Sequence, residues 1–466
     1  MMLIGLLLAL QLAFCSLATA NLPVDLDKLP DFCDPTCEAV YNQSMIVDAS
    51  LCVHPDIKTD PFYDPHQAVV HGDGGDLVRW EDVDANAVSG QWNIPSGLSL
   101  SRFAYVTEDV DGEPLQATAY ALIPYHNPLG PRKPFRVVVW AHGTAGYSPM
   151  CAPSNNKGLQ YHWQAPFALA QQGYLVIAPD YAGLGTPISK GFMYNAGIAH
   201  ANDVSFAVTA ARKSIGHQMS SDWVVVGHSE GGLTAWRTAE REANPKKAVG
   251  GLIGAVAIAP AMEVMSLIPW YIEKAHGGPL GEIFAPFMLG SIDRLFPSFD
   301  FAKYATQGLI DRVNLAYTGC LNVAVTLLAP LTLKEMYLNN ANFIHAPEVE
   351  AWGEKYHGKG PHQLAAPLLV LHGEKDFILP VDYNEGIFDK QCDAFPDSAA
   401  EFVRLPGLDH DGAVQGSHAN YFPWIADRFD KKDCPFRCVK SKPVPATDRF
   451  STVEQVWVSG GQMLVQ

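Results

Sequence analysis

The sequence predicts an α/β fold in which a mostly parallel, doubly wound sheet carries an inserted helical cap. Several short runs are apolar throughout, as expected of strands that are buried on both faces in a parallel sheet. Helical stretches separate most of these runs, which is the alternation of a doubly wound fold. The alternation stops after about residue 259, where roughly 100 residues have helical spacing and many aromatic side chains.

The N-terminal part comes first. Residues 21–98 are rich in Asp, Pro and Gly and show weak periodicity, so we expect an irregular extension tied down by cysteines. An Asn-x-Ser sequon in this extension predicts N-glycosylation at Asn42 and exposure of the segment. Residues 99–107 and 115–123 then alternate like two antiparallel strands, joined through the turn at Asp111-Gly112.

The buried strands follow at intervals along the chain. The predicted strands are 137–140, 174–178, 223–226, 252–258, 368–371 and 402–405, and the helical stretches include 163–173, 196–215 and 230–243. We therefore assign residues 99–260 and 361–430 to the core of the fold and residues 261–360 to a helical cap or lid. A separate helical domain is the alternative, but its position between two sheet strands favours an insertion. The Cys-containing tail, 431–466, has little pattern.

Composition limits the class of partner. The chain has 466 residues, of which 48% are hydrophobic, so it can bury a large core. The formal net charge is −17 and no basic stretch offsets it, which argues against a nucleic-acid partner. This charge suits a protein that does not depend on anionic membrane surfaces.

The first 20 residues are typical of a secretory signal peptide. They form a Leu-rich run that ends in an Ala-x-Ala cleavage signature, so we expect cleavage near Ala20 and a secreted, extracellular protein. No Lys or Arg precedes the apolar stretch, which leaves a membrane anchor as the alternative. That stretch has roughly 14 strongly apolar residues, whereas a span needs about 20. No later segment is long and apolar enough, so no transmembrane segment is expected in the mature chain.

The cysteines predict disulfides. Cleavage of the leader leaves an even number, which favours bridges in a secreted chain without deciding their connectivity. The eight candidates are Cys33, Cys37, Cys52, Cys151, Cys320, Cys392, Cys434 and Cys438. Two of the spacings, Cys-x-x-x-Cys, also occur in zinc sites, but neither has histidines at finger spacing. We therefore expect no metal site and no organic cofactor.

One motif carries the chemistry. Gly227-His228-Ser229-Glu230-Gly231-Gly232 follows an apolar strand and precedes a helical stretch. A strand that turns sharply into a helix at Gly-x-Ser-x-Gly is the nucleophile elbow of serine hydrolases, in which glycines permit a strained turn and a close strand–helix approach. A plain Gly/Ser turn is the alternative, but the strand before it and the helix after it favour a catalytic serine. Ser229 is the predicted nucleophile.

A serine hydroxyl needs a histidine to take its proton and a carboxylate to orient that histidine. In this fold the acid and then the histidine follow the serine, each in a loop after a late strand. Asp376 lies in the loop after the strand at 368–371 and is the predicted acid. Glu374, Asp382 and Asp389 are its competitors.

The predicted base is His410, in a Gly-rich loop after the last strand. His418 is the second choice, but it belongs to the helix that follows. Asp409 and Asp411 flank His410 and should favour its protonated form if they face it, which would move the pH optimum. The other histidines, His228 included, are predicted to be packing or surface residues.

The attacked carbonyl oxygen becomes an oxyanion that needs two N–H donors. One should be the backbone N–H of Glu230, the residue after the nucleophile. The other should come from the loop after the strand at 137–140, where Thr144 is the first choice and Ala145 the second.

These elements together resemble the secretory lipase family of α/β-hydrolases, known mainly from fungi and actinobacteria. The similar motifs, in order over about residues 98–430, are His142-Gly143-Thr144-x-Gly146, Cys151-Ala152-Pro153-Ser154, the runs 167–174 and 178–185, the Ser229 motif and the two late loops. The resemblance implies the α/β-hydrolase fold, hydrolysis of esters, often acylglycerols, and a helical cap that gates the acyl pocket. It also implies a disulfide between Cys151 and Cys320. This chain departs from the pattern at Glu230, where a neutral residue is expected, and in its two Cys-containing ends.

The predicted function is therefore that of a secreted serine carboxylester hydrolase, a lipase or esterase. Ser229, His410 and Asp376 would form and hydrolyse an acyl-enzyme. The partner is a small-molecule or lipid ester, with transient lipid-interface contact through the cap. A serine peptidase of the same fold and a non-catalytic binding protein are the alternatives. The Glu230 side chain is expected to point away from the pocket, and if it faced the pocket it should disfavour anionic substrates.

Overall fold

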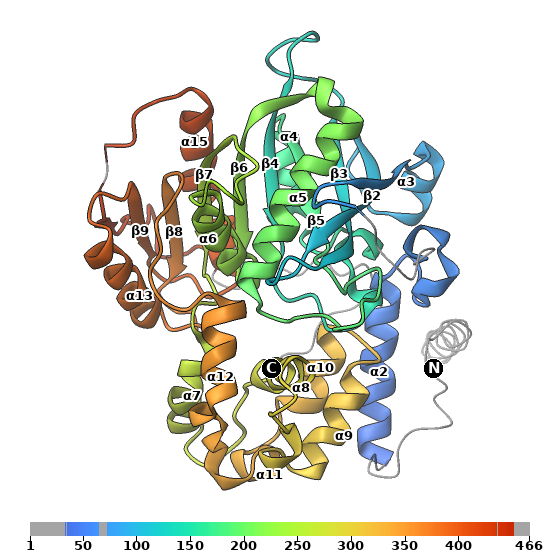
Figure 1. The fold of residues 1–466 in the computed structure, drawn as a ribbon, viewed down its shortest axis with the longest axis vertical. Helices are drawn as coiled ribbons and strands as arrows, with labels where there is room; N and C mark the ends of the chain where they lie inside the picture. Colours follow the sequence, from blue (N-terminus) through green and yellow to red (C-terminus); the bar gives the residue numbers. More distant parts are fainter. Residues whose placement is uncertain (1–32, 34, 65–71, 436, 452–466) are drawn as a thin grey trace, which may run out of the picture.

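The computed structural model describes residues 33, 35–64, 72–435 and 437–451. The predicted signal peptide lies outside these residues. A sheet covered by helices on both faces occupies the upper half of Figure 1, and a group of helices lies below it. Among the described helices, none combines the length and apolar character needed to cross a bilayer.

The sheet confirms the predicted doubly wound α/β class. Its order is β1-β2-β3-β5-β4-β6-β7-β8-β9-β10; β1, β2 and β3 pair antiparallel, β3 pairs antiparallel with β5, and the strands from β5 onward run parallel. The strand bounds are β1 Leu77–Asp82, β2 Leu98–Glu108, β3 Pro114–Pro124, β4 Phe135–Ala141, β5 Leu175–Pro179, β6 Met219–His228, β7 Leu252–Ile258, β8 Leu368–Gly373, β9 Ala400–Leu405 and β10 Val439–Ser441.

Helices cover both faces of the sheet, which explains why its central strands are apolar throughout. In β4, Val137 and Val139 belong to one hydrophobic cluster, while Val138 and Trp140 belong to the other, because successive side chains point to opposite faces. The first cluster includes side chains of α5 (Gly197–Ile215), α6 (Glu230–Glu242) and α13 (Val381–Ala394). The second includes side chains of α3 (Ala85–Gln91), α4 (Pro166–Gln171), α14 (Gly412–Gly416) and α15 (His418–Phe429).

The helices between β7 and β8, which we call the cap helices, form the lower half of Figure 1. They are α7 Ile268–Ala275, α8 Ala285–Leu295, α9 Gln307–Ala316, α10 Leu321–Leu328, α11 Leu333–Met336 and α12 Pro347–Trp352, followed by a π-helical turn, Gly353–His357. The residues from 259 to 367, all of which the structure describes, add no strand to the sheet. Their position beside the carboxyl ends of the parallel strands is where ligands bind in open α/β sheets.

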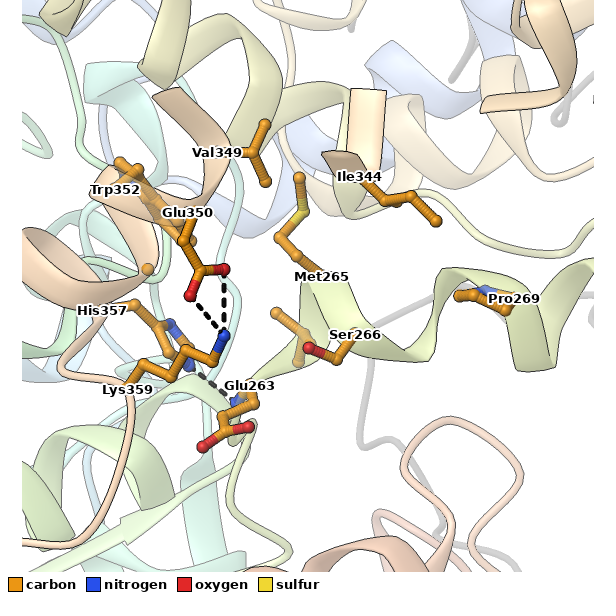
Figure 2. Close-up of a pocket in the computed structure, with 12 residues that line it drawn as sticks. Glu263, Met265, Ser266, Pro269, Ile344, Val349, Glu350, Trp352, His357 and Lys359 are labelled. Atoms are coloured by element: carbon orange, nitrogen blue, oxygen red, sulfur yellow. Dashed lines mark hydrogen bonds and ion pairs between the residues drawn. The ribbon is translucent and has the colours of Figure 1, made fainter. Parts of the chain in front are cut away.

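A cavity of about 230 Å³ lies among the cap helices, between the segment after β7 and the α12 region (Figure 2). Apolar side chains such as Met265 and Trp352 line it. Its polar side carries an ion pair between Lys359 and Glu350, with an N–O distance of 2.7 Å. Small-molecule sites have this composition, a mostly apolar lining with a few polar groups.

The N-terminal extension differs from the irregular segment that the sequence predicted, because residues Pro35–Leu51 form the 17-residue helix α2. This helix lies against the cap helices in Figure 1. The Tyr41 hydroxyl is 2.7 Å from Thr318 Oγ1. The buried Asp48 carboxylate accepts the N–H groups of Cys320 and Val323 at 2.7 and 3.2 Å. Asp48 thus satisfies backbone donors at the N-terminal end of α10, a role usually filled from within the same segment.

Six of the eight candidate cysteines form disulfides: Cys33–Cys37, Cys151–Cys320 and Cys392–Cys438. The bridge implied by the family resemblance, Cys151–Cys320, is among them. The prediction was wrong for Cys52 and Cys434, which are free thiols. Cys52 is buried and its thiol lies 3.6 Å from the Met150 carbonyl oxygen.

The edge strands and the predicted glycosylation site also differ from the sequence-based expectation. β1 and β10, outside the predicted core ranges, extend the sheet at its two edges. Asn42, the predicted glycosylation site, lies inside α2 with its Oδ1 buried, and Ser44 of the same sequon is buried and donates its hydroxyl to the Tyr41 carbonyl. This placement is not the exposed segment that the sequon suggested, and glycosylation of Asn42 stays a prediction.

The link between α2 and the cap helices gives a stability prediction. Asp48→Ala leaves the N–H groups of Cys320 and Val323 without their acceptor, so we expect the free energy of unfolding to fall by about 1–3 kcal/mol. Urea unfolding followed by circular dichroism measures it. Glu38→Ala, at an exposed position of the same helix, is the matched control and should change stability by less than about 0.5 kcal/mol. Equal stability of the two variants contradicts the prediction.

Candidate active site

Ser229 occupies a strained turn between β6 and α6. Its φ of 58° and ψ of −118° are unfavourable for a residue with a side chain. The turn is held by backbone hydrogen bonds on both sides, since the Ser229 N–H donates to Ile258 and the Ser229 carbonyl accepts from Ala261 at 3.0 Å. The surrounding structure therefore supports the strain and presents the serine at the end of the central strand.

The glycines of the motif are required by close packing. A Cβ on Gly231 would lie 1.9 Å from the Ala141 carbonyl oxygen, and one on Gly227 would lie 2.0 Å from the Gly231 carbonyl oxygen. Gly143, in the loop after β4, is also confined, because its Cβ would lie 3.2 Å from Ser229 Cβ. Strand, helix and neighbouring loop can approach this closely only where side chains are absent.

The structure brings the predicted acid and base together. His410 Nδ1 donates to Asp376 Oδ2 at 2.7 Å, and both side chains are buried. The other oxygen of Asp376 accepts the N–H groups of Ile378 and Leu379 at 2.9 and 2.7 Å. Burial alone would raise the pKa of Asp376, but the His410 charge and the side-chain hydrogen bonds from His372 and His410 outweigh it and lower the pKa below its ordinary value.

The base has the opposite shift. Burial lowers the pKa of His410, but the charge of Asp376 and the hydrogen bond to it have a larger effect, so the pKa is raised above its ordinary value. The negative charges of Asp411 and Asp409 add to this effect, as the sequence suggested. Among the described residues, Ser229 Oγ makes no hydrogen bond to the ring, a bond that often forms only when substrate is present.

Two histidines that the sequence left as packing residues contact the predicted acid and the predicted base. His228 Nε2 donates to the His410 carbonyl at 3.0 Å, and its Nδ1 accepts from the Tyr161 hydroxyl at 2.8 Å. His372 Nε2 donates to the Leu379 carbonyl at 2.8 Å and lies 3.3 Å from Asp376 Oδ2. No local sequence signal identified these roles, although each histidine ends a strand beside a predicted catalytic loop.

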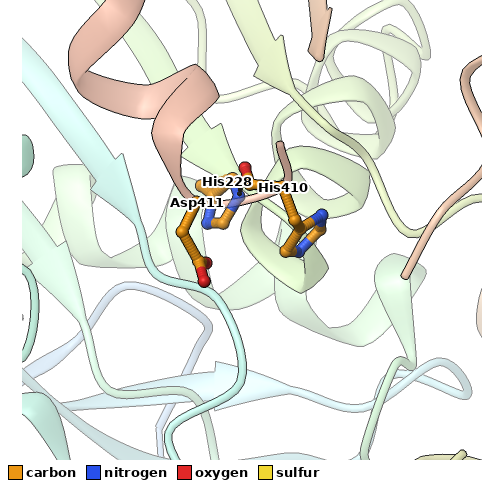
Figure 3. Close-up of side chains that lie close together, drawn as sticks. All are labelled: His228, His410 and Asp411. Atoms are coloured by element: carbon orange, nitrogen blue, oxygen red, sulfur yellow. Dashed lines mark hydrogen bonds between the residues drawn. The ribbon is translucent and has the colours of Figure 1, made fainter. Parts of the chain in front are cut away.

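His228, His410 and Asp411 also lie within 4.8 Å of one another, a grouping that suits a metal ion (Figure 3). Both ring nitrogens of His228 are already in hydrogen bonds, and His410 Nδ1 is bonded to Asp376. We therefore assign the cluster to the hydrogen-bonded site rather than to a metal.

The competing residues have other partners. The acids pair with cations at the edge of the sheet: Glu374 with Arg404 and Lys442, Asp382 with Arg404, and Asp389 with Lys440. His418 Nε2 lies 2.6 Å from the Gln164 carbonyl oxygen and donates to it. None of these side chains replaces Asp376 or His410.

The two predicted oxyanion donors come from different segments: Thr144 from the loop after β4, and Glu230 from the start of α6 directly after Ser229. Within the described part of the chain, the backbone N–H groups of Thr144 and Glu230 donate to no protein acceptor. That of Ala145, the second choice, is equally unbonded. Free N–H groups beside the serine are what an oxyanion site requires.

The Glu230 side chain is fully buried. Its Oε1 accepts the Asn195 N–H at 2.9 Å, its Oε2 has no partner, and His200 Nδ1 lies 3.6 Å away. Burial raises the pKa of Glu230 to about 8 and lowers the pKa of His200 to about 3, so both are neutral near pH 7. A neutral carboxyl at this position avoids a negative charge next to the predicted nucleophile, Ser229.

The comparisons with known proteins agree with this geometry. The model of the alpha/beta hydrolase family matches residues 138–422, more than half of the chain, so the protein belongs to that family. A search of curated protein sequences gives no match.

Solved structures show the same fold at low sequence identity. The closed state of Candida antarctica lipase A is similar with a TM-score of 0.66 and 16% identity, covering 84% of this chain and 91% of that one. The rice cell wall degrading esterase LipA from Xanthomonas oryzae has a TM-score of 0.59 and 17% identity, covering 78% and 100%. A putative hydrolase from Legionella pneumophila has a TM-score of 0.61 and 17% identity, covering 75% and 98%.

The acids beside His410 give a pH prediction. Asp411→Asn removes a negative charge that favours the imidazolium, so the pKa of His410 should fall and neutral base should be present at lower pH. The acid limb of kcat/KM should move down by a few tenths of a pH unit to about one pH unit, which raises kcat/KM near pH 6 by about two- to tenfold. Ester hydrolysis across pH 5 to 10 measures it. Asp393→Asn, at an exposed position on α13, should leave the profile in place, and an unmoved profile in both variants rules out the effect.

Proposed function

We propose that this protein is a secreted serine carboxylester hydrolase that acts on acyl esters. The observation that carries the proposal is the Asp376–His410 hydrogen bond in the loops beside the strained Ser229 turn. Two proteins of similar fold are described as a lipase and a cell wall degrading esterase, which supports an ester substrate. The predicted leader and the three disulfides support secretion.

The chemistry follows from the arrangement. His410 Nε2 takes the Ser229 hydroxyl proton as Oγ attacks the ester carbonyl, and the Asp376 carboxylate stabilises the imidazolium through Nδ1–H. The N–H groups of Glu230 and Thr144 stabilise the oxyanion of the tetrahedral intermediate. The imidazolium then protonates the leaving alkoxide. Water, activated by His410, cleaves the acyl-enzyme and regenerates the serine.

The surroundings favour a largely apolar acyl group. The cap helices bury many apolar and aromatic side chains, and a mostly apolar cavity lies among them, although none of Ser229, Asp376 and His410 lines it. We further propose that the cap helices cover the acyl group of the substrate and contact a lipid interface.

The first test is the nucleophile. Ser229→Ala should reduce kcat on a p-nitrophenyl ester by at least about 10⁴-fold, because no other group can form the acyl-enzyme. A fluorophosphonate probe should label the unaltered protein and leave Ser229→Ala unlabelled. Ser221→Ala, at an exposed position on the same strand, is the matched control and should keep both signals. Retained activity of Ser229→Ala refutes the assignment.

The second test is the substrate class. A panel of p-nitrophenyl esters from acetate to palmitate should be compared with triolein and a peptide amide in the same assay. We expect kcat/KM to be at least about 100-fold higher for the best ester than for the amide, because an amide carbonyl is less electrophilic and an amine is a poorer leaving group than p-nitrophenolate. A higher rate on the amide identifies a peptidase instead.

A further inference from the structure

Two consecutive residues, Tyr194 and Asn195, contact both proposed oxyanion donors. The Tyr194 hydroxyl shares a hydrogen bond of 2.7 Å with Thr144 Oγ1, and the Asn195 N–H donates to Glu230 Oε1 at 2.9 Å. Both residues are buried, and Asn195 has a positive φ of 55°, which is uncommon for a residue with a side chain. The pair lies just before α5 and belongs to neither of the segments it joins.

The hydrogen bonds of Tyr194 and Asn195 bear on the geometry that an oxyanion site requires. An oxyanion is stabilised only when both donors lie about 2.7–3.1 Å from one oxygen position. Thr144 and Glu230 come from different segments, which are separated by 85 residues of the chain. A group that bonds a side chain from each segment therefore limits how far the two donors can move apart.

The same pair is attached to the cap helices. His357 Nδ1 donates to the Asn195 carbonyl at 2.9 Å, and Asn195 Nδ2 lies 3.8 Å from Met288 Sδ on α8. His357 Nε2 in turn accepts the Glu263 N–H at 2.8 Å (Figure 2). Glu263 lies just before the first cap helix and His357 just after the last, so a single imidazole joins both roots of the cap helices to Asn195.

The imidazole of His357 can make both bonds only in its neutral form, with the proton on Nδ1. Burial lowers the pKa of His357 to about 3, so this form persists across the working range of a secreted enzyme. The His357 carbonyl also accepts from Arg237 on α6, the helix that begins at Glu230. His357 therefore also contacts α6, the helix that follows Ser229.

We propose that Tyr194 and Asn195 form a clamp that sets the separation of the two oxyanion donors and couples it to the position of the cap helices. Neither residue is proposed to touch the reacting atoms, so both are positioning residues. The inference rests on the proposed function, because it assigns a role to Thr144 and Glu230 as oxyanion donors. Glu230 contributes twice, with its backbone N–H to the oxyanion and with its side chain to the clamp.

Catalysis, rather than the hydrogen bond to Asn195, should require the Glu230 side chain to be uncharged. The ionisable groups around it are Tyr147, Tyr181, Tyr194 and His200, all buried, and none supplies a positive charge near neutral pH. Ionisation of Glu230 at alkaline pH would therefore place an unbalanced negative charge one residue from the nucleophile. That charge would oppose the oxyanion, so activity should fall as the carboxyl ionises.

The test compares four variants on one p-nitrophenyl ester, with kcat and KM measured separately. Tyr194→Phe and Glu230→Ala should each lower kcat by about 10- to 100-fold with KM changed less than about threefold, which is less than the about 100- to 1,000-fold expected for loss of a donor. Glu230→Gln keeps an oxygen that can accept from Asn195 and should recover most of the kcat lost in Glu230→Ala. Tyr120→Phe removes a buried hydroxyl that has no partner in the described chain and should match the unaltered protein.

The pH profile supplies a readout that a merely structural role would not move. The decline of kcat on the alkaline side, expected as Glu230 ionises near pH 8, should disappear in Glu230→Gln. The rate of fluorophosphonate labelling should fall in Tyr194→Phe in parallel with kcat, because that reaction also builds negative charge on an oxygen beside Ser229. If Glu230→Ala fails to fold, Tyr194→Phe, which removes a single hydroxyl, carries the test.

The outcomes separate the two proposals. The clamp alone is overturned if the unaltered protein hydrolyses the ester and is labelled, but kcat is unchanged in Tyr194→Phe. It is also overturned if Glu230→Gln is as impaired as Glu230→Ala. Losses that appear in KM rather than kcat also overturn it, because they show a binding role. Neither hydrolysis nor labelling by the unaltered protein overturns the proposed function and the clamp with it.

Discussion

The site depends on the close packing of backbone against backbone around Ser229. The turn can hold a positive φ because Gly227 and Gly231 let β6, α6 and the end of β4 approach to distances that a Cβ would block. On its other side the serine is held by two backbone hydrogen bonds, one from its N–H to Ile258 at the end of β7 and one from the Ala261 N–H to its carbonyl. Every other part of the site is a loop that follows a neighbouring parallel strand, so its position depends on this packing through the register of the sheet.

Three buried acids illustrate how surroundings decide the charge of a side chain. Asp376 accepts two backbone N–H groups and the His410 ring, and its pKa is lowered. Glu230 accepts one backbone N–H beside a neutral histidine, and burial raises its pKa to about 8. Asp48 on α2 is intermediate, since burial raises its pKa to about 6 against several hydrogen bonds. Hydrogen bonds and nearby positive charge, not residue type, separate a charged orienting group from a neutral anchoring one.

The cap helices are attached to the rest of the molecule at several separate places. The Cys151–Cys320 disulfide joins the start of α10 to the loop after β4, and Asp48 of α2 bonds the same end of α10. At the roots, His357 connects Glu263 to Asn195. Any movement of the cap helices must therefore keep or break these contacts. The contact at Asn195 continues to Glu230, the first residue of α6.

The sequence by itself determined the class of fold, most of the strands, and the residues Ser229, Asp376 and His410 as candidates for the chemistry. These are local properties, since apolar runs, a glycine-bounded turn and a loop after a strand can be recognised within a few residues. Tertiary structure decided what depends on contacts between distant segments: the support of His228 and His372, the bonds of Tyr194 and Asn195, and which cysteines pair. It also decided α2, whose buried face has helical spacing but includes the polar Ser44 and Asp48. Ser44 donates to the Tyr41 carbonyl within the helix, and the partners of Asp48 lie at the start of α10, so no apolar pattern could mark that helix in the sequence.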